Sequence, residues 1–229
     1  MRLPLLSAFV LSLFTFGHLA ATGAGAQEVH SAPGQFDYYV LNLSWSPAFC
    51  DTMKTLSPRE RYDAGKGMEC AAPHAFVLHG LWPQNTDGTY PSSCADRPGP
   101  RNPQRNLDMT PNLSLLKHEW NKHGTCTTLS PEAFFATARQ AYRSVTIPEF
   151  FTSLDHEARM TPEQILTLFY RANATFPQGS FALSCGNNQL TAIEACFDKD
   201  VHPIACQGVR SCRANSVKIV PENAGGIVQ

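Results

Sequence analysis

Lys-His-Glu-Trp-Asn-Lys-His-Gly, residues 117–124, is the stretch around which the rest of the chain is organised. On an α-helix successive residues turn by about 100°, so His118 would lie over Lys122 and Glu119 over His123, all on one face. The histidines titrate near neutral pH, the lysine carries a positive charge, and a carboxylate four residues before a histidine can orient it. The pattern predicts an anion-binding or acid–base site on a helix that ends at the final glycine.

Two other interpretations of this stretch are a solvated helix face and a zinc site. Mixed charges are typical of a helix face that only meets solvent. Trp120 and Cys126 instead favour a firmly held helix, because a large aromatic ring and a disulfide would anchor it. A zinc-protease site needs two histidines four residues apart, whereas His118 and His123 are five apart, so no such site is predicted.

The N-terminus predicts a secretory signal peptide, residues 1–26. Arg2 precedes an apolar run at residues 3–21, and the Ala-Gly-Ala at residues 24–26 is typical of a cleavage site. A membrane anchor is the alternative, but the run is short and contains polar residues, which favours cleavage after Ala26. The mature chain, residues 27–229, is long enough for one domain with a substantial core, and it contains no second apolar segment of membrane-spanning length.

The charge balance gives no general affinity for nucleic acid. The formal net charge of the chain is −1, and loss of Arg2 with the leader makes it −2. Without a broad positive field, a polyanion would have to be bound by local groups such as Lys122 and the histidines. Composition alone therefore does not suggest RNA or DNA as a ligand.

Eight cysteines follow the predicted cleavage point. An even number in an exported chain implies disulfides, and the lack of a C-x-x-C pair argues against a metal site. For the last four, a nested pairing of Cys185 with Cys212 and Cys196 with Cys206 would clamp antiparallel strands, although spacing alone allows three connectivities. The eight are Cys50, Cys70, Cys94, Cys126, Cys185, Cys196, Cys206 and Cys212.

The first half of the mature chain predicts strands, a short helix and a long loop. Residues 36–45 are rich in β-forming residues and predict a strand. The polar residues 51–68 contain a Ser-Pro-Arg-Glu helix start and predict a short helix. The apolar residues 75–78 predict a second strand, which would deliver residues 79–83 into a loop. Residues 85–105 are rich in Pro, Gly, Ser and Asn and predict a long surface loop.

The second half predicts helices first and strands afterwards. Asn112 or Ser114 could cap the helix of the opening motif. Further helical segments are predicted to start at Ser130-Pro131, Pro148 and Thr161-Pro162. Strands are expected at residues 181–184, 190–197 and 217–220, with a loose tail at 221–229. The chain contains no internal repeat and no linker that would divide it into two domains.

His79 supplies what the helix lacks for acid–base cleavage, which is a histidine from a second element. If it faces His123 across a cleft, one histidine can serve as base and the other as acid. The alternative is structural, with His79 capping a strand while Trp82 and Pro83 pack the loop. The presence of both motifs in one chain favours the catalytic interpretation.

The two motifs resemble the two active-site segments of the ribonuclease T2 family. They are His-Gly-Leu-Trp-Pro at residues 79–83 and His-Glu-Trp-Asn-Lys-His-Gly-Thr-Cys at 118–126, in the family's order and separated by a loop with a cysteine. The strand at 37–45, the leader and the four late cysteines extend the resemblance to essentially the whole mature chain. It implies an exported endoribonuclease, periplasmic or extracellular, in a single domain of α+β fold with an antiparallel sheet packed against helices.

The resemblance also implies a reaction on single-stranded RNA by a monomer that uses no metal or other cofactor. The 2′-hydroxyl would attack the adjacent phosphorus and leave a 2′,3′-cyclic phosphate, later hydrolysed to a 3′-phosphate. His123 would be the base and His79 the acid, and the two would exchange roles in the hydrolysis step. Lys122 and Glu119 would stabilise the pentacovalent phosphate, and His118 would hold a phosphate oxygen. DNA, which lacks the 2′-hydroxyl, would not be cleaved.

Base recognition departs from the family's pattern. Trp82 is the candidate for base stacking. Many members carry an acidic residue that contacts the base directly after the His-Gly-Leu-Trp-Pro segment, whereas this chain has Gln84. An amide can donate as well as accept, which leaves the base preference open. The disulfides that the family implies are Cys50 with Cys70, Cys94 with Cys126, and the nested late pairs.

Two rival functions have their own signatures. A secreted binding or toxin-like protein that had lost catalysis would lack a histidine from one motif, and both motifs are complete. A metal-dependent phosphate-ester hydrolase would need a cluster of acidic residues, and the sequence shows none. Histidines outside the motifs have no expected catalytic role; they are His30, His74, His156 and His202. Sequons at Asn42, Asn112 and Asn173 would accept glycans only in a eukaryotic secretory route.

Overall fold

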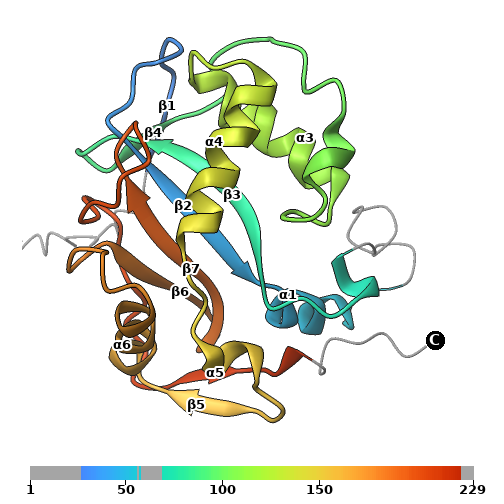
Figure 1. Ribbon diagram of the computed structural model, residues 1–229, viewed down its shortest axis with the longest axis vertical. Helices are drawn as coiled ribbons and strands as arrows, with labels where there is room; N and C mark the ends of the chain where they lie inside the picture. The colour runs from blue at the N-terminus through green and yellow to red at the C-terminus, as the bar shows by residue number, and fades with distance from the viewer. Residues whose placement is uncertain (1–26, 56, 58–68, 223–229) are drawn as a thin grey trace, which may run out of the picture.

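A six-stranded sheet forms the centre of the molecule (Figure 1). The computed structural model describes residues 27–55, 57 and 69–222. The central sheet has the strand order β3-β2-β7-β8-β5, with β6 also paired to β7, and a separate two-stranded sheet joins β1 to β4. The strands are β1 (Gln27–Val29), β2 (Tyr38–Trp45), β3 (Phe76–Gln84), β4 (Thr89–Pro91), β5 (Ala158–Met160), β6 (Phe181–Gly186), β7 (Gln189–Phe197) and β8 (Val217–Ile219).

Helices cover one face of this sheet and its β3 edge, which confirms the expected α+β class. In Figure 1, α4 crosses in front of the strands, α6 lies beside β6 at the lower left, and α3 lies beyond β3. The helices are α1 (Ser46–Met53), α3 (Leu113–Lys122), α4 (Pro131–Ser144), α5 (Glu149–Thr152) and α6 (Pro162–Ala172), with 3₁₀ turns at Glu69–Ala71, Pro103–Asn106 and Gly124–Cys126. Within the described ranges, no helix combines the length and the apolar character that crossing a membrane requires.

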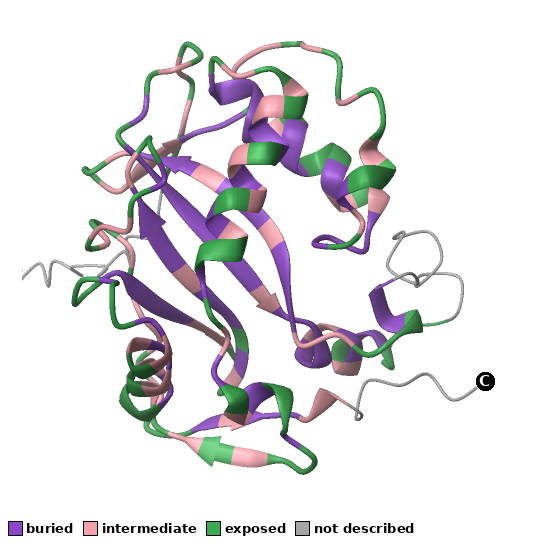
Figure 2. Cartoon of the chain, in the orientation of Figure 1, coloured by how far each residue is buried: buried purple, intermediate pink, exposed green. Residues whose placement is uncertain are grey.

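β2 is the central strand, and its two faces differ. It pairs antiparallel with β3 on one side and with β7 on the other, so most of its length is buried (Figure 2). Because side chains alternate along a strand, Leu41, Leu43 and Trp45 all project into the main core, where they are fully buried. Asn42 and Ser44 project from the opposite face. That second face, which α4 leaves uncovered, carries the candidate site.

α3 is fixed along its whole length beside β3. At its start, Asn112 Oδ1 accepts a hydrogen bond from a backbone N–H of the first turn at 3.0 Å. In its middle, Trp120 is fully buried and its indole N–H donates to a backbone carbonyl at 3.1 Å. Just after its end, the Cys94–Cys126 disulfide ties the chain to the loop that follows β4. The helix that carries the opening motif is therefore held firmly, as Trp120 and Cys126 predict.

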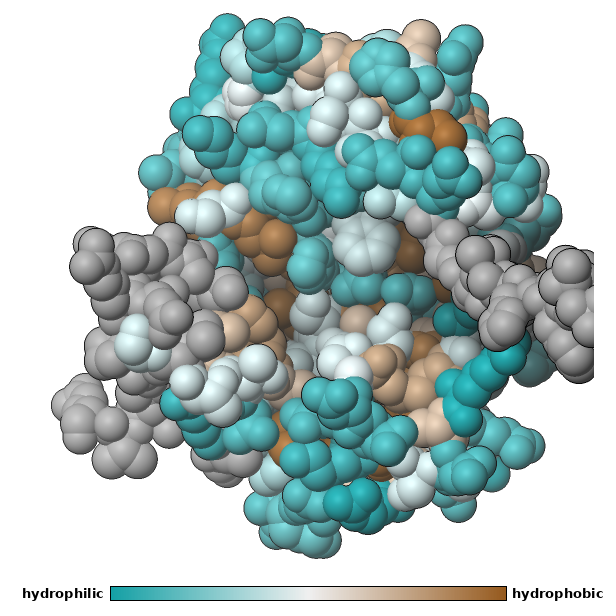
Figure 3. Space-filling model, turned by 180° about the vertical axis from the view of Figure 1, so that it is seen from behind, coloured by the Kyte–Doolittle hydropathy of each residue, from teal (hydrophilic) through white to brown (hydrophobic). Residues whose placement is uncertain are grey.

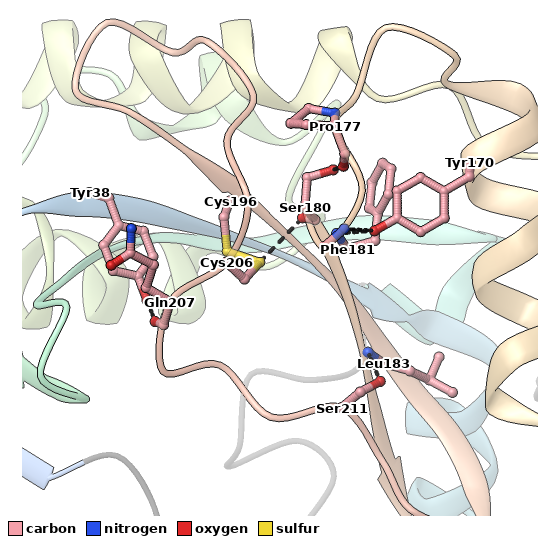
Figure 4. The surroundings of a disulfide bond; sticks show 11 residues. Tyr38, Tyr170, Pro177, Ser180, Phe181, Leu183, Cys196, Cys206, Gln207 and Ser211 are labelled. Atoms are coloured by element: carbon pink, nitrogen blue, oxygen red, sulfur yellow. Dashed lines mark hydrogen bonds between the residues drawn. A yellow bond between two sulfur atoms is a disulfide. The ribbon is translucent and has the colours of Figure 1, made fainter.

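Four disulfides cross-link the chain in the pairs that the family resemblance implies. They are Cys50–Cys70, Cys94–Cys126, Cys185–Cys212 and Cys196–Cys206. The late cysteines are thus nested, which spacing alone leaves open. Figure 4 shows Cys196–Cys206 beside the sheet, where the Tyr38 hydroxyl donates to the Gln207 carbonyl. These contacts tie the irregular segment after β7 to β2.

Most predicted elements are confirmed, and one prediction is wrong. β2, α4, α6 and the late strands lie where the sequence patterns predict them. Residues 79–83 do not form a loop, because β3 continues through them to Gln84 and pairs with β2 over that whole length. α1 ends at Met53, before the Ser-Pro-Arg-Glu start at residues 57–60 from which a short helix is expected within residues 51–68. The leader, residues 58–68 of that expected helix and most of the tail lie outside the described residues.

The three sequon asparagines are structural in the folded protein. Asn42, Asn112 and Asn173 are 6%, 5% and 4% exposed, respectively. Asn112 caps α3, and the Asn173 side chain bonds the backbone of Thr146 through both its oxygen and its nitrogen. The folded surface therefore presents none of these amides to a glycan.

Gly124, which follows α3, leaves no room for a side chain. A Cβ there would lie 2.3 Å from Trp120 Cε3 and 3.1 Å from Phe134 Cδ1. We expect Gly124→Ala to lower the free energy of unfolding by about 2 kcal/mol, since overpacking a core costs roughly that much. Chemical denaturation of the oxidised protein measures this. Gly99→Ala is the matched control, because its Cβ would meet the same Trp120 at an ordinary 3.6 Å. Equal stability of Gly124→Ala and wild type would contradict the packing described here.

Candidate active site

His79 lies at an irregular position in β3. The register of β2 against β3 shifts between Asn42 and Leu43, which leaves His79 without a partner across the ladder. Such a bulge redirects a side chain. The imidazole Nδ1 lies 3.0 Å from Ser44 Oγ, and the His79 side chain keeps 40% of its exposure. β2 thus holds Nδ1 of the ring, and Nε2 faces α3.

Glu119 reaches the same place from α3. Its carboxyl oxygen Oε1 lies 3.6 Å from His79 Nε2, and its other oxygen accepts a hydrogen bond from the Trp82 indole N–H at 2.8 Å. Gly80 makes this approach possible, since a Cβ at that position would lie 1.9 Å from Glu119 Oε2 and 2.4 Å from Trp82 Nε1. Glu119 is only 2% exposed. The carboxyl is therefore packed directly onto the backbone of β3.

His123 closes the other side of the site. It is the residue that caps the C-terminal end of α3, and it is 5% exposed. The Trp82 ring stacks on its imidazole, with centroids 5.5 Å apart and planes 29° apart, and the Tyr90 ring lies 6.4 Å away. Trp82 also contacts His79 edge-on at 5.6 Å. Both histidines of the two motifs therefore meet at one indole ring.

Neither of the remaining motif residues, Lys122 and His118, is buried. Lys122 is partly exposed, and its Nζ lies 5.6 Å from the centre of the Tyr90 ring. His118 is exposed on α3, yet it is near enough for its charge to act on both His79 and His123. The four ionisable residues of the helix are thus near one another, but only Glu119 and His123 are buried. His118 and Lys122 lie toward solvent.

Burial favours the neutral forms of the buried groups in the site. Desolvation, with smaller effects of His118 and Lys122, lowers the pKa of His79 to about 4. Desolvation first, and then the charges of Lys122 and the other two histidines, lower the pKa of His123 to about 3. Desolvation raises the pKa of Glu119 to about 8, although a hydrogen bond and a nearby lysine oppose it. A bound phosphate would raise both histidine pKa values, because negative charge stabilises imidazolium.

The two residues expected at the base, Trp82 and Gln84, lie at different depths, and a further aromatic residue, Tyr90, lies near His123. Trp82 is partly exposed, and one face of its ring is used by His123. Gln84, at the end of β3, is 9% exposed. Tyr90 of β4, which the sequence analysis missed, lies against both His123 and Lys122. Its signal in the sequence is an aromatic residue within a polar, glycine-containing loop close to the first motif.

A group of potential metal ligands lies elsewhere, in the turn after β7. Asp198, Asp200 and His202 place their ligand atoms within 4.8 Å of one another. Asp198 already accepts hydrogen bonds from the backbone N–H groups of Asp200 and His202, which fixes the turn. The candidate site itself combines three histidines, one lysine and one buried carboxyl. That set suits acid–base chemistry on an anionic ester.

Known ribonuclease sequences are similar to this chain. The chain matches the model of the Ribonuclease T2 family over residues 36–206. It is 30% identical over 191 residues to "Ribonuclease DdI" of Dictyostelium discoideum, covering 74% of this chain and 77% of that protein. It is 34% identical over 191 residues to a "Probable ribonuclease" of Haemophilus influenzae, covering 77% of this chain and 63% of that protein. A "Ribonuclease" of Aeromonas hydrophila is 40% identical over 121 residues, which is 52% of this chain and 51% of that protein.

Solved structures share the fold. The RNase-related protein from Calystegia sepium superposes with a TM-score of 0.64 at 23% identity, covering 84% of this chain and 98% of that one. RNase NT in complex with 5′-AMP superposes with a TM-score of 0.60 at 21% identity, covering 82% and 98%. At these identities the structures establish the fold alone, whereas the family match spans both histidine motifs. On that match, the chain belongs to the ribonuclease T2 family, a family of endoribonucleases.

Proposed function

We propose that this protein cleaves single-stranded RNA by transphosphorylation, with His79 and His123 as the acid–base pair. The observation that carries the proposal is the meeting of both histidines at the Trp82 ring, at centroid distances of 5.6 and 5.5 Å, beside the buried Glu119 carboxyl. The two histidines come from different elements, a strand and a helix end. They can therefore act on two different oxygens of one phosphodiester.

In the first step His123 takes the proton of the ribose 2′-hydroxyl. The 2′-oxygen then bonds to phosphorus, the bond from phosphorus to the 5′-oxygen breaks, and His79 gives its proton to that leaving oxygen. His123 Nδ1 is buried without a hydrogen-bond partner in the described part of the chain, so Nε2 is the nitrogen left for the substrate. In the second step the roles reverse, and water opens the 2′,3′-cyclic phosphate to a 3′-phosphate.

Charge that develops on the phosphate meets three groups of α3. Lys122 supplies a positive charge at the edge of the site, and His118 can hold a phosphate oxygen from the solvent side. Glu119 has a raised pKa, so at neutral pH its carboxyl carries a proton that it can donate to a phosphoryl oxygen. Together these three side chains would stabilise the pentacovalent phosphate, and the proposed mechanism uses no metal ion.

Aromatic rings explain how a chain with a net charge of −1 can hold RNA. Trp82 and Tyr90 both lie at the site, and base stacking on such rings contributes affinity that does not depend on charge. Stacking requires unpaired bases, which favours single-stranded substrates. The Gln84 amide, at the end of β3, is the candidate for a polar contact to a base.

The four disulfides support export of the protein, since such bonds persist in oxidising compartments. We infer that residues 1–26 are a signal peptide and that the mature chain, residues 27–229, is a single catalytic domain. It would act as a monomer, in the periplasm or outside the cell, without a membrane anchor.

The direct test compares RNA and DNA homopolymers of matched sequence in the presence of EDTA, with products resolved by mass. We expect RNA fragments that end in 2′,3′-cyclic phosphate, and no cleavage of DNA. His79→Ala and His123→Ala should each lower the rate at least about a hundredfold, because each removes one partner in proton transfer. His156→Ala is the control, since that histidine is exposed on a distant loop before β5. Intact RNA with folded wild-type protein would refute the proposal.

The pH profile of kcat/KM gives a second prediction. The base works when His123 is neutral, which is above its pKa of about 3. The acid works when His79 is protonated, which is below its pKa of about 4. We therefore expect a narrow bell with an acidic maximum for the free enzyme, and a kcat profile displaced to higher pH because the bound phosphate raises both pKa values.

Lys122→Met is the matched variant for this profile. The Lys122 charge lowers the pKa of both histidines, so its removal should move both limbs of the kcat/KM profile to higher pH. Lys54→Met, which removes an exposed lysine from the end of α1, should leave the limbs in place. A kcat/KM maximum at or above neutral pH in the wild type would contradict the assignment of the two histidines.

A further inference from the structure

The sheet face that carries His79 has a floor of small side chains. Residues paired across neighbouring strands project from the same face. One row across the sheet consists of Ala182, Glu194, Asn42 and Gly80, and the next consists of Ser184, Ala192, Ser44 and Val77. Glu194 is the one charged residue in these two rows. Figure 3 shows this face, hollowed across its middle between hydrophilic edges.

Glu194 is held in one orientation by its neighbours. Its Oε1 accepts hydrogen bonds from Asn42 Nδ2 at 3.2 Å and from Ser184 Oγ at 3.0 Å. Among the described residues, no donor bonds the other oxygen, Oε2, and the side chain is partly exposed. Burial raises the pKa of Glu194, while the two hydrogen bonds oppose that shift. The carboxyl thus presents one fixed acceptor on this face of the sheet.

Glu194 lies on the same sheet face as the groups of the candidate active site, two strands away from Gly80. Gly80, two strands away in the same row, lies directly beneath the Glu119 carboxyl. Two strand spacings correspond to about 10 Å. Ser44, in the neighbouring row, holds the His79 ring. A nucleotide attached to a phosphate at His79 and Glu119 can therefore lie over this floor and reach Glu194.

We infer that Glu194, oriented by Asn42 and Ser184, forms a nucleobase subsite that selects guanine at one of the two positions flanking the scissile phosphate. The inference rests on the proposed ribonuclease function and adds a specificity to it. An ionised carboxylate only accepts hydrogen bonds. Guanine offers adjacent N1–H and N2–H donors on its Watson–Crick edge, so both can point toward Oε2.

The other bases fit this acceptor less well. Adenine and cytosine each present an amino donor next to a ring-nitrogen acceptor, which would face the carboxylate unfavourably. Uracil presents one N–H between two carbonyl oxygens, and both would be repelled. The small residues Ala182 and Ala192 leave space beside Glu194 without adding a competing polar group. The expected order is guanine first and uracil last.

The test uses DNA oligonucleotides that contain one ribonucleotide, so that a single junction can be cleaved. The base on each side of that junction is varied in turn, and kcat/KM is measured, at a pH above the raised pKa of Glu194, for wild type, Glu194→Gln and the control Glu163→Gln. Glu163 is exposed in the first turn of α6, on the helical side of the sheet. In Glu194→Gln the amide oxygen can still accept from Asn42 and Ser184, while its NH₂ replaces the free acceptor with a donor.

We expect wild type and Glu163→Gln to prefer guanine over uracil at one position, and Glu194→Gln to lose that preference by roughly tenfold. Rates at junctions without guanine should change little. The inference would be overturned if wild type showed no preference for guanine. It would also be overturned if Glu194→Gln kept the wild-type ratio of kcat/KM for guanine over uracil, or lost kcat/KM equally for all four bases. Failure of wild type to cleave any junction would instead overturn the ribonuclease proposal.

A measurement on the wild type needs no substitution. The side-chain carboxyl of Glu194 is followed by ¹³C NMR during titration with guanosine monophosphate and then with uridine monophosphate. The account predicts a shift of this signal with the guanosine ligand that is at least severalfold larger. Equal responses to the two nucleotides would contradict the subsite even if Glu194→Gln failed to fold.

Discussion

The packing of the Glu119 carboxyl onto Gly80 is the contact on which the rest of the site depends. It requires a residue without a side chain at the closest point between α3 and β3, because a Cβ would lie 1.9 Å from the carboxyl oxygen. One residue before Gly80 lies His79, and one helical turn after Glu119 lies His123. The contact therefore fixes the separation of two histidines that are far apart in the sequence. The Cys94–Cys126 disulfide and the α3 cap hold the helix in that place.

The same packing sets the chemistry of the site. Removing water from Glu119, His79 and His123 disfavours their charged forms, so the pKa of the acid rises and those of the histidines fall. The free site is then a set of neutral groups with Lys122 at its edge. An anionic substrate would supply the missing charge and favour the protonated form of His79, which is the form that the proposed acid requires. In the proposed mechanism, binding of the substrate and protonation of His79 are therefore coupled through electrostatics. Because of this coupling, the site does not need a strongly basic surface around it.

Local pattern was enough to predict much of the fold. The strand β2 follows from its β-forming residues, and α4 and α6 follow from Ser130 or Thr161 placed before proline. The local sequence predicts a loop for His-Gly-Leu-Trp-Pro, because this segment follows the end of the short apolar run at residues 75–78. Long-range pairing with β2 and the bulge at His79 keep it extended, and neither is visible in the local sequence. The position of Tyr90 near His123, and the row that places Glu194 beside Asn42, likewise depend on how the strands pair. The local sequence therefore could not predict them.

The protonation state of Glu119 in the ligand-free protein tests the central claim most directly. Side-chain ¹³C NMR of the wild type, with the signal assigned by comparison with Glu119→Gln, gives the titration curve of that carboxyl. The account predicts a carboxyl that is largely protonated at neutral pH and titrates at about 8. A carboxyl that titrates near the ordinary glutamate value of about 4.3 would show that Glu119 is solvated, and it would contradict the buried contact from which the site is built.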